Sequence, residues 1–301
     1  MLIPAFVMSE KIQMKDSILM ETLRYTRRSK SAMFGLFVIC FFVMMAVAAP
    51  LIAPHSPLVQ NLKGNLQPGF WVNKGAGFLG TDNFGRDILS RIIYGARISL
   101  TVGLIAVLIG VLLGMFAGVA AGFLGGWVDN LIMRIVDIMF SLPSILLAIV
   151  IVAVLGRGLD KVMIAIGITY APQIARVVRS QTIVVRNNEF IEAARATGAS
   201  SLRIMVVHVL PNILSVLIVY GTLSIGSAIL DAAALGFLGL GAQPPTPEWG
   251  AMLADGIHSI TGGYWWVETF PGIAIFLTVL GFNLLGDGLR DAADPRLRRN
   301  A

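Results

Sequence analysis

The sequence has few charged residues, and this scarcity excludes most classes of soluble protein. Only 13% of its 301 residues are Asp, Glu, Lys or Arg, whereas 56% are hydrophobic. Soluble domains carry roughly 25% charged residues, so this chain cannot cover a globular surface with polar groups. Its surroundings must be largely lipid, where every backbone polar group has to be paired internally. We therefore predict an all-α polytopic membrane protein.

Several chemical motifs are also missing. The one cysteine, Cys40, cannot form an internal disulfide. His55, His208 and His258 are far apart in the sequence, and the chain has neither the Cys/His spacing of a metal site nor the glycine-lysine loop that binds nucleotide phosphates. We therefore predict no catalytic residue, no metal site and no bound cofactor. Lys and Arg lie between apolar runs, which favours membrane topology over nucleic-acid binding.

Apolar runs define the predicted crossings, because a spanning helix needs about 20 such residues. Five uncharged runs, and a shorter sixth bounded by Lys161 and Arg176, lie at 33–53, 98–123, 138–156, 162–175, 209–230 and 269–286. The run at 33–53 is interpreted as a retained anchor rather than a cleaved signal. Six crossings place both ends on one side, and the distribution of Lys and Arg puts that side in the cytoplasm, although the basic first outside loop fits this rule poorly.

These crossings divide the chain into five predicted parts. A cytoplasmic N-terminal tail (1–32) precedes the first transmembrane helix (33–53) and a periplasmic loop (54–97). The transmembrane core (98–290) contains a coupling loop (180–207), and a cytoplasmic C-terminal tail (291–301) follows. The end of the periplasmic loop, RDILSRIIYGAR, is amphipathic, so we expect a helix lying on the outer membrane surface there.

Two local patterns within the crossings predict contacts. Glycines spaced by four share one helix face and allow close helix approach, either within this subunit or against a partner; they are Gly110, Gly114, Gly118 and Gly122. Arg134 and Asp137 are three residues apart, so they can form an ion pair near the cytoplasmic interface.

The stretch RNNEFIEAARATGASSLRIMVVHVLPN, residues 186–212, overlaps the coupling loop and predicts two short helices separated by a glycine. Asn188 suits an N-cap and Glu189 the first helical turn. Gly198 suits the residue after the helix end, and Ser200 or Ser201 can cap a second helix. Such a two-helix projection can rest on its own subunit or on lipid, or it can insert into a groove of another protein.

The residues of this loop resemble the EAA motif of ATP-binding-cassette (ABC) importer permeases. The matching residues are Glu192, Ala193, Ala194, Gly198, Leu210 and Pro211. His208 stands where many importers carry Ile, and His-x-Leu-Pro resembles the peptide and nickel branch. Residues 79–100 and 228–253 are similar to further C-type signatures, and the resemblance extends from about residue 30 to the C-terminus. Asp231, where oligopeptide relatives carry Glu, is most similar to the dipeptide branch.

This resemblance implies a fold, a function and partners. It implies the type I importer permease fold and alternating access in a bacterial inner membrane. The substrate would be dipeptides, with nickel or oligopeptides as alternatives and a secondary carrier as a remote one. The partners would be a homologous B-type permease, two ATPase subunits that bind the ATP and Mg²⁺, a periplasmic peptide-binding protein and the lipid bilayer. Coupling residues would be Glu192, Ala193, Ala194, Arg195, Gly198, Leu210 and Pro211.

Polar residues in the fifth crossing are candidates for the translocation path, although several of them can equally be ordinary helix contacts. They are Asn212, Ser215, Tyr220, Thr222, Ser224 and Ser227. Asp231 is a carboxylate in an otherwise uncharged stretch, which is costly unless it is paired, capped or wetted. It caps the next helical turn or faces the cavity, where it could attract a peptide ammonium group.

Overall fold

The computed structural model describes residues 29–72, 77–257, 259 and 262–293, and these residues form helices and loops without a named strand. Five helices are long and apolar enough to cross a membrane: α2 (Lys30–Val47), α4 (Ile88–Leu124), α7 (Leu159–Arg186), α10 (Leu210–Phe237) with the turns before it, and α12 (Trp266–Ala293). The pair α5 (Gly126–Phe140) and α6 (Ser144–Leu155) makes a sixth if it counts as one span. The predicted number of crossings thus depends on this pair.

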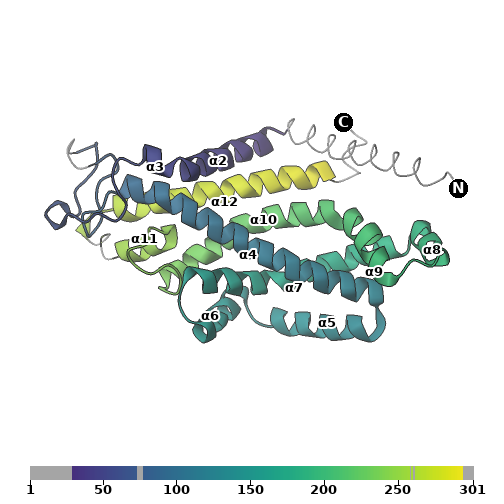
Figure 1. The fold of residues 1–301 in the computed structure, drawn as a ribbon. Coiled ribbons are helices and arrows are strands. Elements are labelled where there is room, and N and C mark those ends of the chain that lie inside the picture. Colours follow the sequence, from purple (N-terminus) through teal and green to yellow (C-terminus); the bar gives the residue numbers. More distant parts are fainter. Residues whose placement is uncertain (1–28, 73–76, 258, 260–261, 294–301) are drawn as a thin grey trace.

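The long helices run side by side and define two ends of the molecule (Figure 1). One end carries α8 (Glu189–Ala196), α9 (Ser201–Ile204) and the π-turn η2 (Met205–Val209), and we call residues 187–209 the hook. The other, which we call the loop end, carries α3 (Ala49–Ile52), η1 (Leu62–Gly64), α11 (Trp249–Gly256) and the loops around them. The start of α2 and the end of α12 both point toward the hook end.

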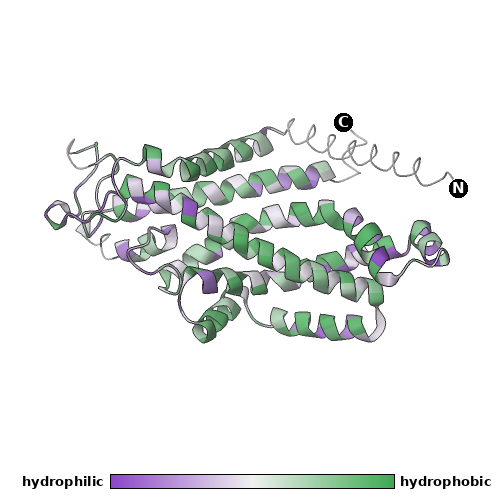
Figure 2. Cartoon of the chain, in the orientation of Figure 1, coloured by the Kyte–Doolittle hydropathy of each residue, from purple (hydrophilic) through white to green (hydrophobic). Residues whose placement is uncertain are grey.

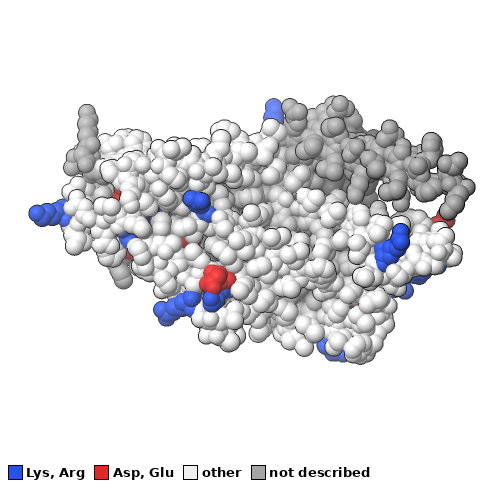
Figure 3. All heavy atoms as spheres, viewed as in Figure 1, with Lys and Arg blue, Asp and Glu red and all other residues white. Residues whose placement is uncertain are grey.

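Hydropathy and charge follow this arrangement. The long helices are mainly hydrophobic, whereas hydrophilic residues concentrate in the loops at one end and in the hook at the other (Figure 2). Most of the visible surface carries no charged side chain (Figure 3). Large apolar side chains such as Phe37, Phe116 and Phe276 are more than 60% exposed, as expected for helices whose outer faces contact lipid or another subunit.

The predicted crossing at 138–156 was wrong in its boundaries. The chain bends by 95° between α5 and α6, and the break includes Pro143, the N-cap residue of α6. The residue before a proline is disfavoured in helical conformation, which makes this a natural breaking point. The crossing at 162–175 was predicted too short, because α7 extends to Arg186 and carries Arg176 and Arg179 within the helix.

Two further sequence predictions are corrected. The amphipathic stretch after residue 86 is no separate surface helix: it forms the first turns of α4, where Ile88 and Ile92 are buried in a core cluster with Trp249. Asp137 pairs with Arg176 of α7, at 2.7 Å, rather than with Arg134. The predicted tails, 1–32 and 291–301, lie mostly outside the described residues. Residues 30–32 belong to α2, and residues 291–293 belong to α12.

The glycine face of α4 lies against α7 of the same chain, where the two helices cross closely. A Cβ atom added to Gly114 would lie 2.7 Å from the backbone oxygen of Ala171, and one added to Gly118 would lie 2.6 Å from that of Ala175. Gly110 and Gly122 meet α7 in the same way, near Tyr170 and Thr182. Small residues thus let the two backbones approach, and this contact fixes the position of Tyr170.

Candidate functional site

The first half of the hook is helix α8, which follows α7 after a two-residue link. Asn188 occupies the N-cap position, as predicted, but its side chain makes no cap hydrogen bond. Its amide instead donates to the carbonyl oxygens of Val184 and Val185, both at 3.2 Å. These bonds satisfy the end of α7, while Glu189 and Glu192 place negative charge in the first turn of α8.

Helix α8 is held to the body of the protein by its apolar face. Ile191 is fully buried in a cluster that includes Phe123 of α4 and Val209. Ala194 is partly buried against the same cluster, and the guanidinium group of Arg195 lies 5.4 Å from the ring centre of Phe123. An apolar anchor of this kind fixes the orientation of a short helix that could not hold its shape alone.

The rest of α8 is exposed. Glu192 and Ala193 are exposed to solvent, and Arg195 is exposed where its guanidinium group lies beside Phe123. The structure therefore separates the predicted coupling residues into two groups. Glu192, Ala193, Arg195 and Gly198 lie on the outer surface of the hook, whereas Ala194, Leu210 and Pro211 are half-buried toward the supporting helices.

Gly198 ends α8 in a left-handed conformation, with a φ of +81°. The amide of Ala199 donates to the carbonyl of Ala194 at 3.1 Å, and the amide of Gly198 donates to that of Arg195 at 2.9 Å. These two bonds form a Schellman motif, in which glycine adopts the left-handed position without a Cβ penalty. The predicted glycine break therefore has a defined geometry.

The second half of the hook leads into α10 without a gap. The side chain of Ser200 accepts a hydrogen bond from the amide of Arg203 and caps α9. The helix then widens through the π-turn at Met205–Val209, directly before Pro211. Proline provides no amide hydrogen and crowds the carbonyl four residues earlier, and a π-turn relieves that conflict. The side-chain amide of Asn212 also donates a hydrogen bond to the carbonyl of His208, within the π-turn, at 2.5 Å.

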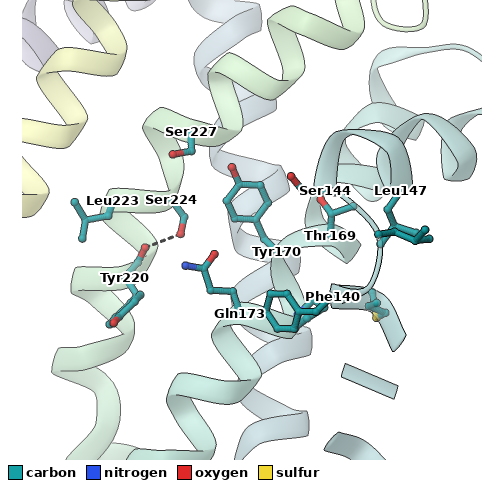
Figure 4. A pocket seen from close by; sticks show the side chains of 13 residues that line it. Phe140, Ser144, Leu147, Thr169, Tyr170, Gln173, Tyr220, Leu223, Ser224 and Ser227 are labelled. Carbon is teal, nitrogen blue, oxygen red and sulfur yellow. Dashed lines mark hydrogen bonds between the residues drawn. The ribbon is translucent and has the colours of Figure 1, made fainter. Parts of the chain in front are cut away.

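A cavity of about 400 Å³ lies between α5, α6, α7 and α10. Its polar lining comes from Thr169, Tyr170 and Gln173 on α7, and from Tyr220, Ser224 and Ser227 on α10 (Figure 4). The apolar part of the wall includes Phe140, Leu147 and Leu223. The cavity therefore combines an apolar wall with hydroxyl and amide groups, a mixture that suits a small polar solute.

Of the six polar candidates in the fifth crossing, three line this cavity and three do not. Tyr220, Ser224 and Ser227 are in the wall. Asn212 and Thr222 donate hydrogen bonds to carbonyl oxygens one turn earlier in the chain, and Ser215 is exposed; none of these three is part of the cavity wall. Sequence reasoning missed Thr169, Tyr170 and Gln173. Three polar residues in the short apolar run at 162–175 were the signal that could have identified them.

Asp231 lies within α10 rather than at its end, so the prediction that it caps a helical turn was wrong. Its carboxylate accepts a hydrogen bond of 2.9 Å from the hydroxyl of Tyr170. Tyr170 itself is part of the cavity wall. The carboxylate is thus connected to the cavity through a tyrosine, and the cavity lining contains no Lys or Arg among the described residues.

This chain is similar to known proteins over most of its length. The family model described as "Binding-protein-dependent transport system inner membrane component" matches residues 110–299, which include the hook and most of the cavity wall. The chain belongs to this family of transport permeases. A second model, the N-terminal TM domain of oligopeptide transport permease C, matches residues 17–68. The resemblance therefore begins before residue 30, where the sequence motifs placed its start. The chain is thus a multi-pass membrane permease subunit of a bacterial ABC importer.

Named relatives cover nearly the whole permease. It is 51% identical to the dipeptide transport system permease protein DppC of Escherichia coli K12, over 93% of this chain and 94% of that protein. It is 48% identical to the di/tripeptide transport system permease protein DppC of Pseudomonas aeruginosa, over 91% of this chain and 90% of that protein. It is 49% identical to the glutathione transport system permease protein GsiD of Shigella flexneri, over 91% and 89%.

A solved structure has the same fold. An inward-facing form of the methionine ABC transporter MetNI contains a chain that matches with a TM-score of 0.55 and 22% identity. The match covers 69% of this chain and 98% of that one. This likeness shows the importer permease fold.

Proposed function

We propose that this permease forms half of the translocation path of a dipeptide importer, together with a homologous B-type permease. The observation that carries the substrate assignment is the identity of about half of all residues with permeases named for dipeptide or di/tripeptide transport. ATP and Mg²⁺ are bound by two partner ATPase subunits, and a peptide-binding protein delivers the substrate. The permease contributes no catalytic residue.

The test is reconstitution of the complete complex in proteoliposomes. We expect ATP-dependent accumulation of dipeptides when the binding protein is present on the outside and ATP on the inside. Omission of the ATPase subunits should abolish accumulation. Nickel or long oligopeptides accumulating in place of dipeptides would overturn the substrate assignment, and dipeptide accumulation without any ATPase would overturn the importer mechanism.

The hook is proposed to lie in the cytoplasm and to dock on an ATPase subunit. This proposal is supported by two sides of the same helix: Ile191 anchors α8 in the body of the permease, while Glu192 and Ala193 are exposed. A helix fixed on one face and polar on the other can transmit a displacement to α7 and α10, which it joins. Both ends of the chain are proposed to be cytoplasmic as well.

This docking can be tested at Glu192. We expect Glu192→Arg to assemble normally in the membrane but to lower ATP-driven uptake strongly, because it reverses the charge on the exposed face. Ser180→Arg is the matched control, because Ser180 is also exposed, on the last turns of α7. Equal uptake by the Glu192→Arg variant and the native complex would contradict the docking proposal.

The cavity between α5, α6, α7 and α10 is proposed to be part of the translocation path. A carboxylate within a membrane span is a functional candidate by default, because burial in lipid without a partner is costly. Asp231 and Tyr170 are joined by a hydrogen bond at the cavity. We infer that this pair attracts the ammonium group of a peptide that passes through.

The pair can be tested with peptides that differ at the N-terminus. Asp231→Asn should lower uptake of peptides with a free N-terminus more than that of N-acetylated peptides, because it removes the negative charge but keeps the shape. Ser215→Ala serves as a control outside the cavity. An Asp231→Asn variant with unchanged preference between the two peptides would eliminate this role.

A further inference from the structure

Aromatic side chains gather at the loop end, where the segments at 69–72 and 77–78 meet the start of α12. We define this aromatic cluster as Phe70, Trp71, Phe78, Trp265 and Phe270. Trp71 is its centre, with ring centres 5.4 Å from Trp265, 5.8 Å from Phe270 and 5.7 Å from Phe70. Phe70 and Phe78 stack at 4.9 Å. The cluster therefore joins a loop to a spanning helix through rings alone.

The cluster is well fixed on one side and open on the other. Its inner neighbour Trp266 is buried and donates a hydrogen bond from its indole nitrogen to the carbonyl of Thr81, at 3.3 Å. By contrast, Phe70 and Phe78 are each 58% exposed, and Trp265 is 49% exposed. These three large rings leave apolar surface exposed, so the cluster requires surroundings that can cover an apolar surface.

The exposed side of the cluster continues the outer face of α12. Trp265, Thr269, Ile273 and Phe276 follow one another at intervals of four, four and three residues and are all exposed. Residues at this spacing share one face of a helix. The exposed rings of the cluster are thus aligned with Ile273 and Phe276, which lie deeper along the same spanning helix.

The length of α12 gives the depth of the cluster. Trp265 and Arg290 are separated by about 37 Å at about 1.5 Å per residue, and the hydrocarbon core is about 30 Å thick. If the last turn, which holds Arg290, reaches one interface, Trp265 lies a few ångströms outside the hydrocarbon at the other. Tryptophan is enriched at that depth, because its ring is apolar and its N–H is polar.

We propose that the aromatic cluster is seated in the lipid headgroup region and that it anchors the segments around Phe70, Trp71 and Phe78 to the membrane surface. Its partner is the boundary between headgroups and acyl chains, not a protein. Thr81, three residues after Phe78, accepts a hydrogen bond through its carbonyl from the indole nitrogen of Trp266. The anchor would therefore also hold the residues next to Phe78. The membrane would therefore fix the position of the whole loop end relative to the spanning helices.

The test uses tryptophan emission of the assembled complex in nanodiscs. Native protein and Trp265→Phe are compared in lipids brominated near the headgroup, in lipids brominated near the chain ends, and in water-soluble acrylamide. The difference in emission between the native protein and the Trp265→Phe variant isolates the emission of Trp265. Phenylalanine keeps an aromatic ring in contact with the cluster. Trp249→Phe provides the matched control, because Trp249 is fully buried.

We expect the Trp265 difference emission to be quenched at least twofold more by shallow than by deep bromine, and to be little affected by acrylamide. The Trp249 difference emission should respond weakly to all three quenchers. The proposal is overturned if Trp265 is quenched by acrylamide but not by brominated lipid. It is equally overturned if neither lipid quenches Trp265 and addition of the binding protein shields it from acrylamide, because the cluster would then be a protein contact.

Discussion

At the scale of single residues, glycines have two different roles in this permease. Gly198 needs its left-handed backbone to end α8, with no heavy atom within 4 Å of an added Cβ atom. Gly114 has an ordinary helical backbone, but an added Cβ atom would lie 2.7 Å from a carbonyl oxygen of α7. The first glycine is required by conformation and the second by space, so substitutions at the two positions should fail differently.

Gly198→Val should loosen the end of α8 and uncouple the hook. The left-handed conformation costs a residue with a Cβ atom about 1–2 kcal/mol, which corresponds to a roughly 5- to 30-fold shift in the ratio of ordered to disordered hook. We expect normal membrane insertion and continued ATP hydrolysis by the complex, with peptide uptake reduced by at most a factor in this range. Hydrolysis and uptake are measured in the same vesicles.

Gly239→Val is the control for Gly198→Val. Gly239 has a similar φ of +74° and also has no heavy atom within 4 Å of an added Cβ atom, but it lies outside the hook. It should introduce the same backbone strain without loss of coupling. If both variants lower uptake equally, the effect of Gly198 is general strain rather than a property of the hook.

Gly114→Ala should destabilise the packing of α4 on α7. The backbone oxygen of Ala171 cannot move aside as a flexible side chain would, and overpacking of this kind typically costs about 1–3 kcal/mol. Gly221→Ala is the matched comparison in another spanning helix, because its Cβ atom would lie 3.6 Å from Val111, an ordinary contact. We expect thermal unfolding in detergent at a lower temperature for Gly114→Ala only, and equal temperatures would contradict this interpretation.

At the scale of elements, α5 has little apolar packing, since Val136 is the one buried residue among its 15 residues. Ion pairs fasten it to α7. Arg179 binds Asp129 through two hydrogen bonds, of 2.5 Å and 2.6 Å, and Arg176 binds Asp137 at 2.7 Å. The end of α5 contributes Phe140 to the cavity wall, so a shift of α5 would change the cavity.

The two pairs should not be equally important. Asp129 and Arg179 are 17% and 32% exposed, whereas Asp137 and Arg176 are 63% and 54% exposed. Solvent-exposed ion pairs contribute only about 0–1 kcal/mol, while a bidentate and partly buried pair is stronger. We expect Asp129→Asn to increase proteolysis between α5 and α6 markedly, and Asp137→Asn to increase it little.

A charge exchange separates the ion pair from other effects of the substitution. The double variant Asp129→Arg with Arg179→Asp should recover part of the protection that Asp129→Asn loses, because opposite charges again face each other. Absence of any recovery, together with equal sensitivity of the Asp129→Asn and Asp137→Asn variants, would show that the pairs do not hold α5.

At the scale of the whole molecule, the hook and the loop end are at opposite ends of the helix bundle (Figure 1). The loop end has a buried charged group of its own, in which Arg86 binds Asp82 at 2.6 Å and Asp255 at 2.9 Å. Nearby, Glu248 caps α11 by accepting hydrogen bonds from the amides of Gly250 and Ala251. Burial raises the pKa of Glu248, and these hydrogen bonds oppose the rise.

Orientation in the membrane can be measured with single cysteines. After Cys40→Ser, the exposed positions Glu192 in the hook and Leu62 in the loop end are each changed to cysteine. In intact cells treated with a maleimide that cannot cross the inner membrane, we expect labelling of the Leu62 position and none at Glu192. Opening cells that lack the ATPase subunits should allow labelling at Glu192. The reverse pattern would invert the proposed topology and remove the hook from the ATPase side.

The sequence by itself determined the membrane class, the approximate spans and the helix–glycine–helix pattern of the hook. These features depend on local composition, on helical spacing and on one glycine, so they can be predicted from neighbouring residues. The boundary at 138–156 was missed although Pro143 marks the break in the sequence. The extension of α7 beyond residue 175 was missed because Arg176 and Arg179 are paired with carboxylates of α5 only in the folded structure. Only the tertiary structure brought Tyr170 to Asp231, 61 residues apart, and Trp71 to Trp265. Contacts between distant segments depend on how helices pack, and hydropathy along the chain carries no information about which faces meet.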